Sequence, residues 1–213
     1  TNFIHLENGN TRINVKLKGE TETEINAQGP TITEKDVLKL YEKLDLVSSG
    51  DTLVLAGSVP SGLPQDIYER IMSRLQGKGI RFAVDATGEL LTNVLKYQPF
   101  LIKPNRAELE EIFSQKLPRD EDIAAAAKEL KRKGAVNVLI SLGGDGALLV
   151  DEFGKVHREK AIPGKVINTV GSGDSMVAGF LVGAEKGYEY ALRLGIAAGS
   201  ATAFSTGLAG KEE

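Results

Sequence analysis

The sequence predicts an α/β protein whose core is a doubly wound, mostly parallel β-sheet flanked by helices. Two observations carry this prediction. From residue 31 onward, short and continuously apolar segments alternate with stretches of helical periodicity, which is typical of a parallel sheet covered on both faces. Residues 1–30 do not fit this pattern: at 11–18, polar and apolar side chains alternate one by one, as they do in a strand with one solvated face.

The first thirty residues therefore predict a small β appendage. Residues 11–18 alternate polar side chains such as Arg12 and Asn14 with apolar ones such as Ile13, and residues 22–26 can pair with them. Such a ribbon is either a solvated sheet edge or a lid over a ligand. The pattern by itself favours the edge.

The α/β part opens with a predicted helix. Thr33 and Asp36 form a capping-box signature, and apolar residues follow it at helical spacing. The further predicted strands lie at 53–56, 82–84, 101–102, 138–140 and 147–150. The further predicted helices lie near 65–76, 88–97, 105–113, 120–133, 174–186 and 188–204.

Composition limits the possible classes of protein. The 213 residues, 41% of them hydrophobic and 26% charged, can bury the core of one ordinary domain with a small appendage. No apolar run approaches the roughly 18 residues that span a bilayer, and no secretion signal opens the chain. A formal net charge of −3 argues against a nucleic-acid surface, and zero cysteines fit a reducing compartment. We therefore expect a cytoplasmic protein that binds a small molecule and neither nucleic acid nor a membrane.

The glycine-rich turn at 168–175, Asn-Thr-Val-Gly-Ser-Gly-Asp-Ser, runs directly into a helical pattern. Such a turn points backbone N–H groups at one spot, next to the positive end of a helix dipole. The carboxylate of Asp174 lies within the first turn, so the segment combines an anion site with a base, which suits phosphoryl transfer. The alternative interpretation is an ordinary helix start that Ser172 or Asp174 caps.

Polar or glycine-rich turns also follow the predicted strands, at 57–62, 85–88, 103–108 and 141–146. The carboxyl ends of parallel strands meet at one edge of a sheet, where ligands bind. Asn105 and Glu108 stand three residues apart at a helix start, so both can face one side and order a hydrated Mg²⁺ near phosphates. Their alternative role is a helix cap with an acid in the first turn.

These motifs together resemble a known family. The segment N-T-V-G-S-G-D-S-M-V-A-G-F at 168–180 is similar to the C-terminal signature of the ribokinase-like, phosphofructokinase-B sugar kinases. Supporting motifs occur in the family's order and spacing: G-S-V-P-S-G at 57–62, K-P-N-R-A-E at 103–108, S-L-G-G-D-G at 141–146 and A-A-G-S-A-T-A at 197–203. Within the family, T-R-I-N-V-K at 11–16 resembles the bacterial 1-phosphofructokinases and the tagatose-6-phosphate kinases.

The resemblance implies a ribokinase-like fold and a catalytic role for the turn. Asp174 is the expected base, which deprotonates the sugar hydroxyl that attacks the γ-phosphate of ATP. Gly171, Ser172 and Gly173 are expected to supply the amides of the anion hole.

The resemblance also implies binding roles. Arg12 and Ser58 are expected to meet the phosphate already on the sugar, with Asp174 at its reacting hydroxyl, which makes the appendage a lid. The residues expected at ATP are Lys103, Asn105, Glu108, Ser141, Gly143, Gly144, Asp145, Gly146, Ile196 and Ser200. The residues expected at metal ions are Glu108 for Mg²⁺ through water, and Asn168, Val170, Thr202, Ser205 and Gly207 for the K⁺ that some members bind.

The implied activity is ATP- and Mg²⁺-dependent phosphorylation of a ketohexose phosphate, foremost fructose 1-phosphate to fructose 1,6-bisphosphate. Tagatose 6-phosphate is the alternative substrate, and a homodimer through the lid is a further expectation. A dinucleotide-binding oxidoreductase fits worse, because S-L-G-G-D-G lacks the G-x-G-x-x-G register. A non-catalytic sugar-phosphate-binding regulator on the same fold also stays open, although the retained Asp174 argues against it.

The match to the family is incomplete in one respect. The family's sugar-binding aspartate near the N-terminus and its G-G-K-G-x-N turn appear nowhere in this sequence. We therefore expect residues 1–30 to be a partial lid and residues 31–213 a nucleotide-binding core that is incomplete at both ends. On that basis the 213 residues alone are expected to be poorly stable and inactive.

Overall fold

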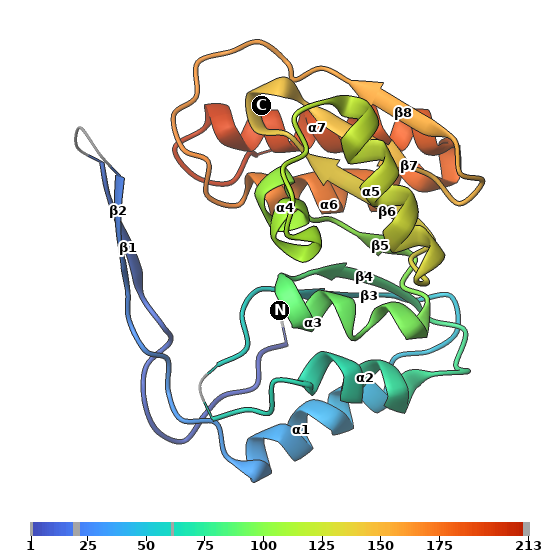
Figure 1. Cartoon of the computed structure of the whole chain (residues 1–213). Coiled ribbons are helices and arrows are strands. Elements are labelled where there is room, and N and C mark those ends of the chain that lie inside the picture. The colour runs from blue at the N-terminus through green and yellow to red at the C-terminus, as the bar shows by residue number, and fades with distance from the viewer. Residues whose placement is uncertain (1, 19–21, 61, 211–213) are drawn as a thin grey trace. The chain divides into compact units, whose positions relative to one another are not determined.

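The computed structural model of the chain describes residues 2–18, 22–60 and 62–210, which form two compact units (Figure 1). The first unit comprises Thr1–Asp51 and Ser58–Ile80, and the second comprises Thr52–Gly57 and Arg81–Glu213. The predicted functional division into a lid of residues 1–30 and a core of residues 31–213 stays a prediction.

The first unit contains a two-stranded antiparallel sheet, which confirms the predicted β appendage. Its strands are β1 (Asn14–Lys18) and β2 (Glu22–Asn26). Val15 lies opposite Ile25 in the register, so their side chains are on the same face. Ile13 and Leu17 each lie two residues from Val15, and side chains two residues apart along an extended chain point the same way, so all four share one face. That face is open to solvent, because Ile13 is 67% and Ile25 54% exposed.

Two helices complete the first unit, α1 (Glu34–Asp45) and α2 (Ile67–Leu75). The predicted capping box opens α1: Thr33 Oγ1 accepts from the Asp36 amide at 3.3 Å, and Asp36 Oδ2 accepts from the Thr33 amide at 3.2 Å. Arg74 of α2 donates two hydrogen bonds to the carboxylate of Asp45, at 2.9 and 2.6 Å, which ties the ends of the two helices together.

The second unit is built on a six-stranded sheet in the order β3-β4-β5-β6-β7-β8. Its strands are β3 (Thr52–Ala56), β4 (Arg81–Asp85), β5 (Leu101–Ile102), β6 (Asn137–Ser141), β7 (Ala147–Val150) and β8 (Val156–Glu159). Strands β3 to β6 run parallel, whereas β7 and β8 are antiparallel to their neighbours. The doubly wound, mostly parallel sheet predicted from the sequence is therefore confirmed.

Helices cover both faces of this sheet, with α5 on one side and α6 and α7 on the other (Figure 1). The helices are α3 (Gly88–Thr92), α4 (Arg106–Phe113), α5 (Asp120–Arg132), α6 (Ser172–Gly183) and α7 (Tyr188–Phe204). Phe180 of α6 and Leu192 of α7 pack in one apolar core with Leu101 and Leu139 of the sheet. Among the described residues, no helix combines the length and the apolar character needed to cross a membrane.

Glycines let α6 and α7 approach each other backbone to backbone. A Cβ atom at Gly179 would lie 2.7 Å from the carbonyl oxygen of Leu194, and one at Gly195 would lie 2.9 Å from that of Met176. Real Cβ atoms do not come this close, so larger residues would push the helices apart. The crossing with α7 therefore fixes the place of α6, whose first turn carries the predicted anion site.

Candidate active site

The first turn of α6 has the geometry of an open helix N-terminus. Gly171 takes the N-cap position with φ 79° and ψ −3°, and α6 begins at Ser172, two residues before the predicted start. No side chain caps the helix. The hydroxyl of Ser172 donates instead to the carbonyl of Gly199 at 2.8 Å, so the alternative interpretation of an ordinary start capped by Ser172 or Asp174 is wrong.

The backbone amides of this turn are largely unpaired. The Ser172 amide donates to the carbonyl of Thr169 at 3.2 Å, and the Ser175 amide donates to Gly171 at 2.9 Å. Within the described part of the chain, the amides of Gly171, Gly173 and Asp174 donate to no protein acceptor. Unpaired amides at the positive end of a helix favour an anion, and the exposed carboxylate of Asp174 lies beside them.

A buried ion pair lies against the same turn. Lys103 follows β5 and is only 6% exposed, and its Nζ lies 3.1 Å from Oδ2 of Asp85, the last residue of β4. A Cβ atom at Gly173 would lie 3.2 Å from this Nζ. The ammonium group is therefore next to the N-terminal backbone of α6, as its predicted role toward the nucleotide phosphates requires.

Asp85 is a site residue that the sequence analysis did not single out. Burial raises the pKa of its carboxyl; the Lys103 ammonium opposes this rise and the charge of Asp174 adds to it. A Cβ atom at Gly173 would also lie 4.0 Å from Asp85 Oδ2, so Asp85 and Lys103 both lie next to the turn that carries Asp174. The signal that could have found Asp85 is its place as the first residue after the apolar run 82–84.

The start of α4 is closed by its own side chains. Asn105 Oδ1 accepts from the Glu108 amide at 2.9 Å, and Glu108 Oε2 accepts from the Asn105 amide at 2.8 Å. This reciprocal capping box is the alternative role that the sequence left open for the two residues, and their predicted contact with Mg²⁺ stays a prediction. Ser141 lies next to them, because its amide donates to the carbonyl of Pro104 at 3.1 Å.

The turn between β6 and β7 exposes two glycines. Gly143–Asp145 form a 3₁₀ helix in which Gly143 has φ 58°, and Gly143 and Gly144 are open to solvent. Gly146 has φ 97°, and a Cβ atom there would collide with the carbonyl of Glu159. The carbonyl of Asp145 accepts from Arg158 Nη1 at 2.8 Å. The turn is thus anchored at its end and accessible at its tip, as a phosphate-binding loop must be.

The two residues predicted at the adenine differ in exposure. Ile196 of α7 is 4% exposed and belongs to the apolar core of the second unit, whereas Ser200 one turn later is partly exposed. The core contacts of Ile196 leave it little free surface. Its role at the adenine stays a prediction.

The residues predicted at a monovalent cation lie on two segments in contact, the loop before α6 and the C-terminal end of α7 with the residues after it. Asn168 Nδ2 donates to the carbonyl of Thr206 at 3.1 Å, and Asn168 Oδ1 accepts from the Val170 amide at 3.1 Å. The Thr202 hydroxyl contacts Ser175 Oγ at 2.8 Å. Ser205 Oγ donates to the carbonyl of Ala201 at 2.8 Å, and Gly207 is exposed nearby in sequence. Hydroxyl and carbonyl oxygens are the ligands that hard cations prefer.

In the first unit, the two residues predicted at the sugar phosphate contact each other, and their role there stays a prediction. Arg12 Nη1 donates to Ser58 Oγ at 3.1 Å, and Arg12 Nε donates to Asn14 Oδ1 at 2.8 Å. All three residues line one pocket, together with Asn26 and Gln28. A pocket with a guanidinium and several polar side chains suits a phosphate group.

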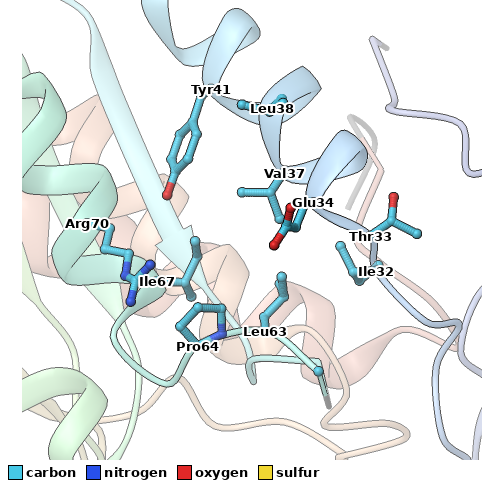
Figure 2. A pocket seen from close by; sticks show the side chains of 11 residues that line it. Ile32, Thr33, Glu34, Val37, Leu38, Tyr41, Leu63, Pro64, Ile67 and Arg70 are labelled. Carbon is cyan, nitrogen blue, oxygen red and sulfur yellow. The ribbon is translucent and has the colours of Figure 1, made fainter.

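A second pocket of the first unit lies between α1 and α2 (Figure 2). Its walls are mostly apolar and include Val37, Leu63 and Ile67, while Tyr41 and Arg70 extend into it from one side. None of the predicted site residues lines it. Among the described residues, no group of three or more His, Cys, Asp or Glu side chains could hold a metal ion.

Comparison with known proteins assigns the family. The chain matches the family model described as pfkB family carbohydrate kinase over residues 1–213. It belongs to this family. The resemblance found in its motifs is therefore confirmed, whereas the roles of the anion turn, Lys103 and the turn at 141–146 stay predictions.

Named relatives support a narrower group. The chain is 46% identical over 207 residues to "1-phosphofructokinase" of Bacillus subtilis, covering 96% of this chain and 68% of the relative. It is 39% identical over 211 residues to "D-tagatose-1-phosphate kinase" of Bacillus licheniformis, covering 98% of this chain and 69% of the relative. The chain thus spans about two thirds of the length of these relatives.

A solved structure has the same fold. Phosphofructokinase-2 of Escherichia coli in complex with substrates and products superposes with a TM-score of 0.86 at 32% identity, covering 93% of this chain and 67% of that chain. Two further structures of that enzyme are described as a complex with potassium and as a tetrameric inhibited form. These descriptions concern the Escherichia coli enzyme.

Proposed function

We propose that this chain carries the phosphoryl-transfer site of an ATP-dependent kinase that converts fructose 1-phosphate to fructose 1,6-bisphosphate. The observation that carries the proposal is the uncapped first turn of α6, with unpaired amides and Asp174 beside them. Such a turn stabilises negative charge on a transferred phosphoryl group. The named relatives, a 1-phosphofructokinase and a D-tagatose-1-phosphate kinase, support a ketohexose 1-phosphate as substrate class.

The proposed reaction is an in-line displacement. The carboxylate of Asp174 accepts the proton of the sugar hydroxyl as its oxygen forms a bond to the γ-phosphorus of ATP. The bond between that phosphorus and the oxygen bridging to the β-phosphate breaks, and ADP leaves. The amides of Gly171 and Gly173 stabilise charge on the transferred group, and the Lys103 ammonium neutralises charge on the nucleotide phosphates.

The donor set suits Mg²⁺ bound chiefly through phosphates. Mg²⁺ usually keeps several waters and uses one or two carboxylates with substrate phosphates, which agrees with the lack of an acidic cluster among the described residues. Glu108 is the carboxylate that we propose to hold it through water. When bound, the ion neutralises charge on the phosphate oxygens. The oxygens of Asn168, Val170, Thr202, Ser205 and Gly207 suit K⁺, which we propose as a second ion.

We further propose that the lid binds the C1 phosphate and contributes to a homodimer. The Arg12 guanidinium, 3.1 Å from Ser58 Oγ in a polar pocket, supports the first role. The exposed apolar face of β1 and β2 supports the second, because a second copy of the ribbon would cover it. The enzyme is proposed to act in the cytoplasm, where ATP and sugar phosphates are available.

The test is steady-state kinase activity with MgATP on the complete protein that the gene encodes. The candidate acceptors are fructose 1-phosphate, tagatose 1-phosphate, tagatose 6-phosphate, fructose 6-phosphate and ribose. We expect the highest kcat/KM with fructose 1-phosphate. Preference for either tagatose phosphate would keep the mechanism and change the substrate, and turnover of none would favour the regulator.

The same assay on residues 1–213 alone tests the expectation that this segment is inactive. Turnover at the rate of the complete protein would overturn that expectation. Thermal unfolding of both proteins, followed by circular dichroism, separates a loss of folding from a loss of the sugar site.

A further inference from the structure

We propose that Asp85 is a positioning residue of this kinase: its carboxylate holds the Lys103 ammonium against the open N-terminus of α6. This inference rests on the proposed function, because it assigns the partner through which Lys103 acts there. The two side chains form a pair with 3.1 Å between Nζ and Oδ2, and both are largely buried.

The sheet register sets up this pair. β4 and β5 are parallel, with Ala83 opposite Leu101 and Val84 opposite Ile102. The backbone continues the ladder for one more step, because the Lys103 amide donates to the carbonyl of Val84 at 3.2 Å. Residues at equivalent positions of neighbouring strands point to the same face of a sheet. The register of the two strands therefore places Asp85 next to Lys103, at the carboxyl ends of the strands, where ligands bind.

Gly173 provides the space for the pair at the helix. A Cβ atom there would lie 3.2 Å from Lys103 Nζ, 3.5 Å from Lys103 Cε and 4.0 Å from Asp85 Oδ2. The backbone of Gly173 does not have a positive φ, so conformation does not demand glycine at this position. Lack of a side chain lets the ammonium reach the unpaired amides, and together they form one anion site.

Asp85 decides whether that ammonium stays in place. A buried ammonium without an anionic partner is unfavourable, so the side chain of such a lysine turns toward water. The carboxylate of Asp85, 3.1 Å from Lys103 Nζ, holds the ammonium in place while no phosphate is bound. An arriving γ-phosphate then meets a donor that needs no reorganisation, which is the condition for strong electrostatic catalysis.

The inference predicts a specific pattern of kinetics in the complete protein. Asp85→Asn should lower kcat about 10²-fold, as misplacement of a catalytic contact does, with little change in the KM for the sugar. Lys103→Met should lower kcat by about 10² to 10³, as loss of a transition-state donor does. Because Asp85 acts through Lys103, the double variant should be no slower than Lys103→Met. A merely structural pair would lower the unfolding temperature of each single variant without lowering the kcat of the folded enzyme.

Asp151→Asn is the matched control. Asp151 and His157 also form a largely buried pair, with 2.8 Å between Oδ2 and Nε2, but they join the ends of the β7–β8 connection. This variant should lower stability and leave kcat unchanged. An Asp85→Asn enzyme as fast as the wild type would overturn the inference. So would a double variant much slower than Lys103→Met, because Asp85 would then act on the substrates independently.

A second measurement needs no turnover. In lysine-selective ¹⁵N NMR, the Lys103 ammonium should give a protected signal in the wild type that is lost in Asp85→Asn. If the wild type lacks kinase activity but this signal behaves as expected, the proposed function fails and the positioning of Lys103 stands. If the signal is unchanged in Asp85→Asn, the positioning role is wrong whatever the activity.

Discussion

The helices α4 and α6 both begin at predicted phosphate-binding motifs, yet their first turns are completed in opposite ways. At α4, Asn105 and Glu108 satisfy each other's backbone amides. At α6 no side chain caps the helix, and a buried ammonium lies against the turn. The same local pattern, a polar residue at a helix start with an acid in the first turn, thus closes one helix and leaves the other open. The open helix is where negative charge can be stabilised.

The largest expected effect comes from removing the base at the open helix. Asp174→Asn should lower kcat by about 10²- to 10⁴-fold, as loss of a general base does, and leave ATP affinity nearly intact. Steady-state kinetics and calorimetric titration of ATP measure the two quantities. Glu185→Gln, at an exposed position beyond the end of α6, is the control. If ATP affinity fell as much as kcat, Asp174 would be a structural element of the turn.

A smaller effect is expected when the space at the open turn is filled. Gly173→Ala should lower kcat about 10-fold, because its Cβ atom would displace the Lys103 ammonium. The same change should leave stability unchanged or raise it by up to about 1 kcal/mol, because alanine favours a helix over glycine. Ala178→Gly, at an exposed position of α6, is the reverse control: it should lower stability and leave kcat unchanged. Equal kcat for Gly173→Ala and the wild type would contradict the close approach of Lys103.

A change at the capped start of α4 should lower the free energy of unfolding. Asn105→Ala removes the cap of α4 and should cost about 1 kcal/mol of the free energy of unfolding. Asn105→Asp should recover most of this loss, since aspartate caps a helix about as well as asparagine. Urea denaturation of the three proteins measures the difference. No loss in Asn105→Ala would show that the hydrogen bonds of this box do not hold α4 in solution.

The smallest effect tests a second closed helix, α1. Hydrogen bonds from the Thr33 hydroxyl and amide hold the pKa of Asp36 below its usual value, and Lys39 adds to this. A depressed pKa in the folded state means that the cap stabilises above the unfolded pKa of about 3.9. The contribution is lost as the pH falls through the lower folded value. The stability difference between the wild type and Asp36→Asn should therefore shrink below about pH 4.

Glu34→Gln serves as the control for α1, since Glu34 is exposed in the same first turn. Urea unfolding between pH 3 and pH 6, chosen to bracket the usual carboxyl range, measures both variants. A difference for Asp36→Asn that stays constant over this range would mean that its carboxyl is not the titrating group.

Periodicity predicted most of the fold, because the strands of a parallel sheet are apolar throughout and its helices are amphipathic. It missed β8, whose segment Val156–Glu159 is mostly charged or polar and owes its pairing to the hairpin with β7. It also extended one helix from 88 to 97, whereas α3 ends at Thr92 and a separate 3₁₀ turn follows at Leu95–Tyr97.

The candidate site was predictable residue by residue where a motif is local. The turn at 168–175 could be predicted from its own residues, because glycines followed by a helical pattern indicate a tight turn that leads into a helix N-terminus. The pairing of Asp85 with Lys103 was not predictable in this way, since it depends on the register between β4 and β5. Whether the caps at Asn105 and at Gly171 are closed or open likewise depends on side-chain geometry, which residue types alone do not determine.

The glycine crossing between α6 and α7 has a consequence for protein engineering. Replacing helical glycines by alanine is a common route to thermostable variants, because it reduces the entropy of the unfolded chain. At Gly179 and Gly195 replacement by alanine should instead lower the stability, since a methyl group at either position would meet backbone atoms of the facing helix. A shift of even part of an ångström would be carried along α6 to its first turn. Stabilising substitutions are therefore better sought at glycines with open space and no positive φ. Gly144 meets both conditions, but it lies in the predicted phosphate loop, where a substitution could impair binding.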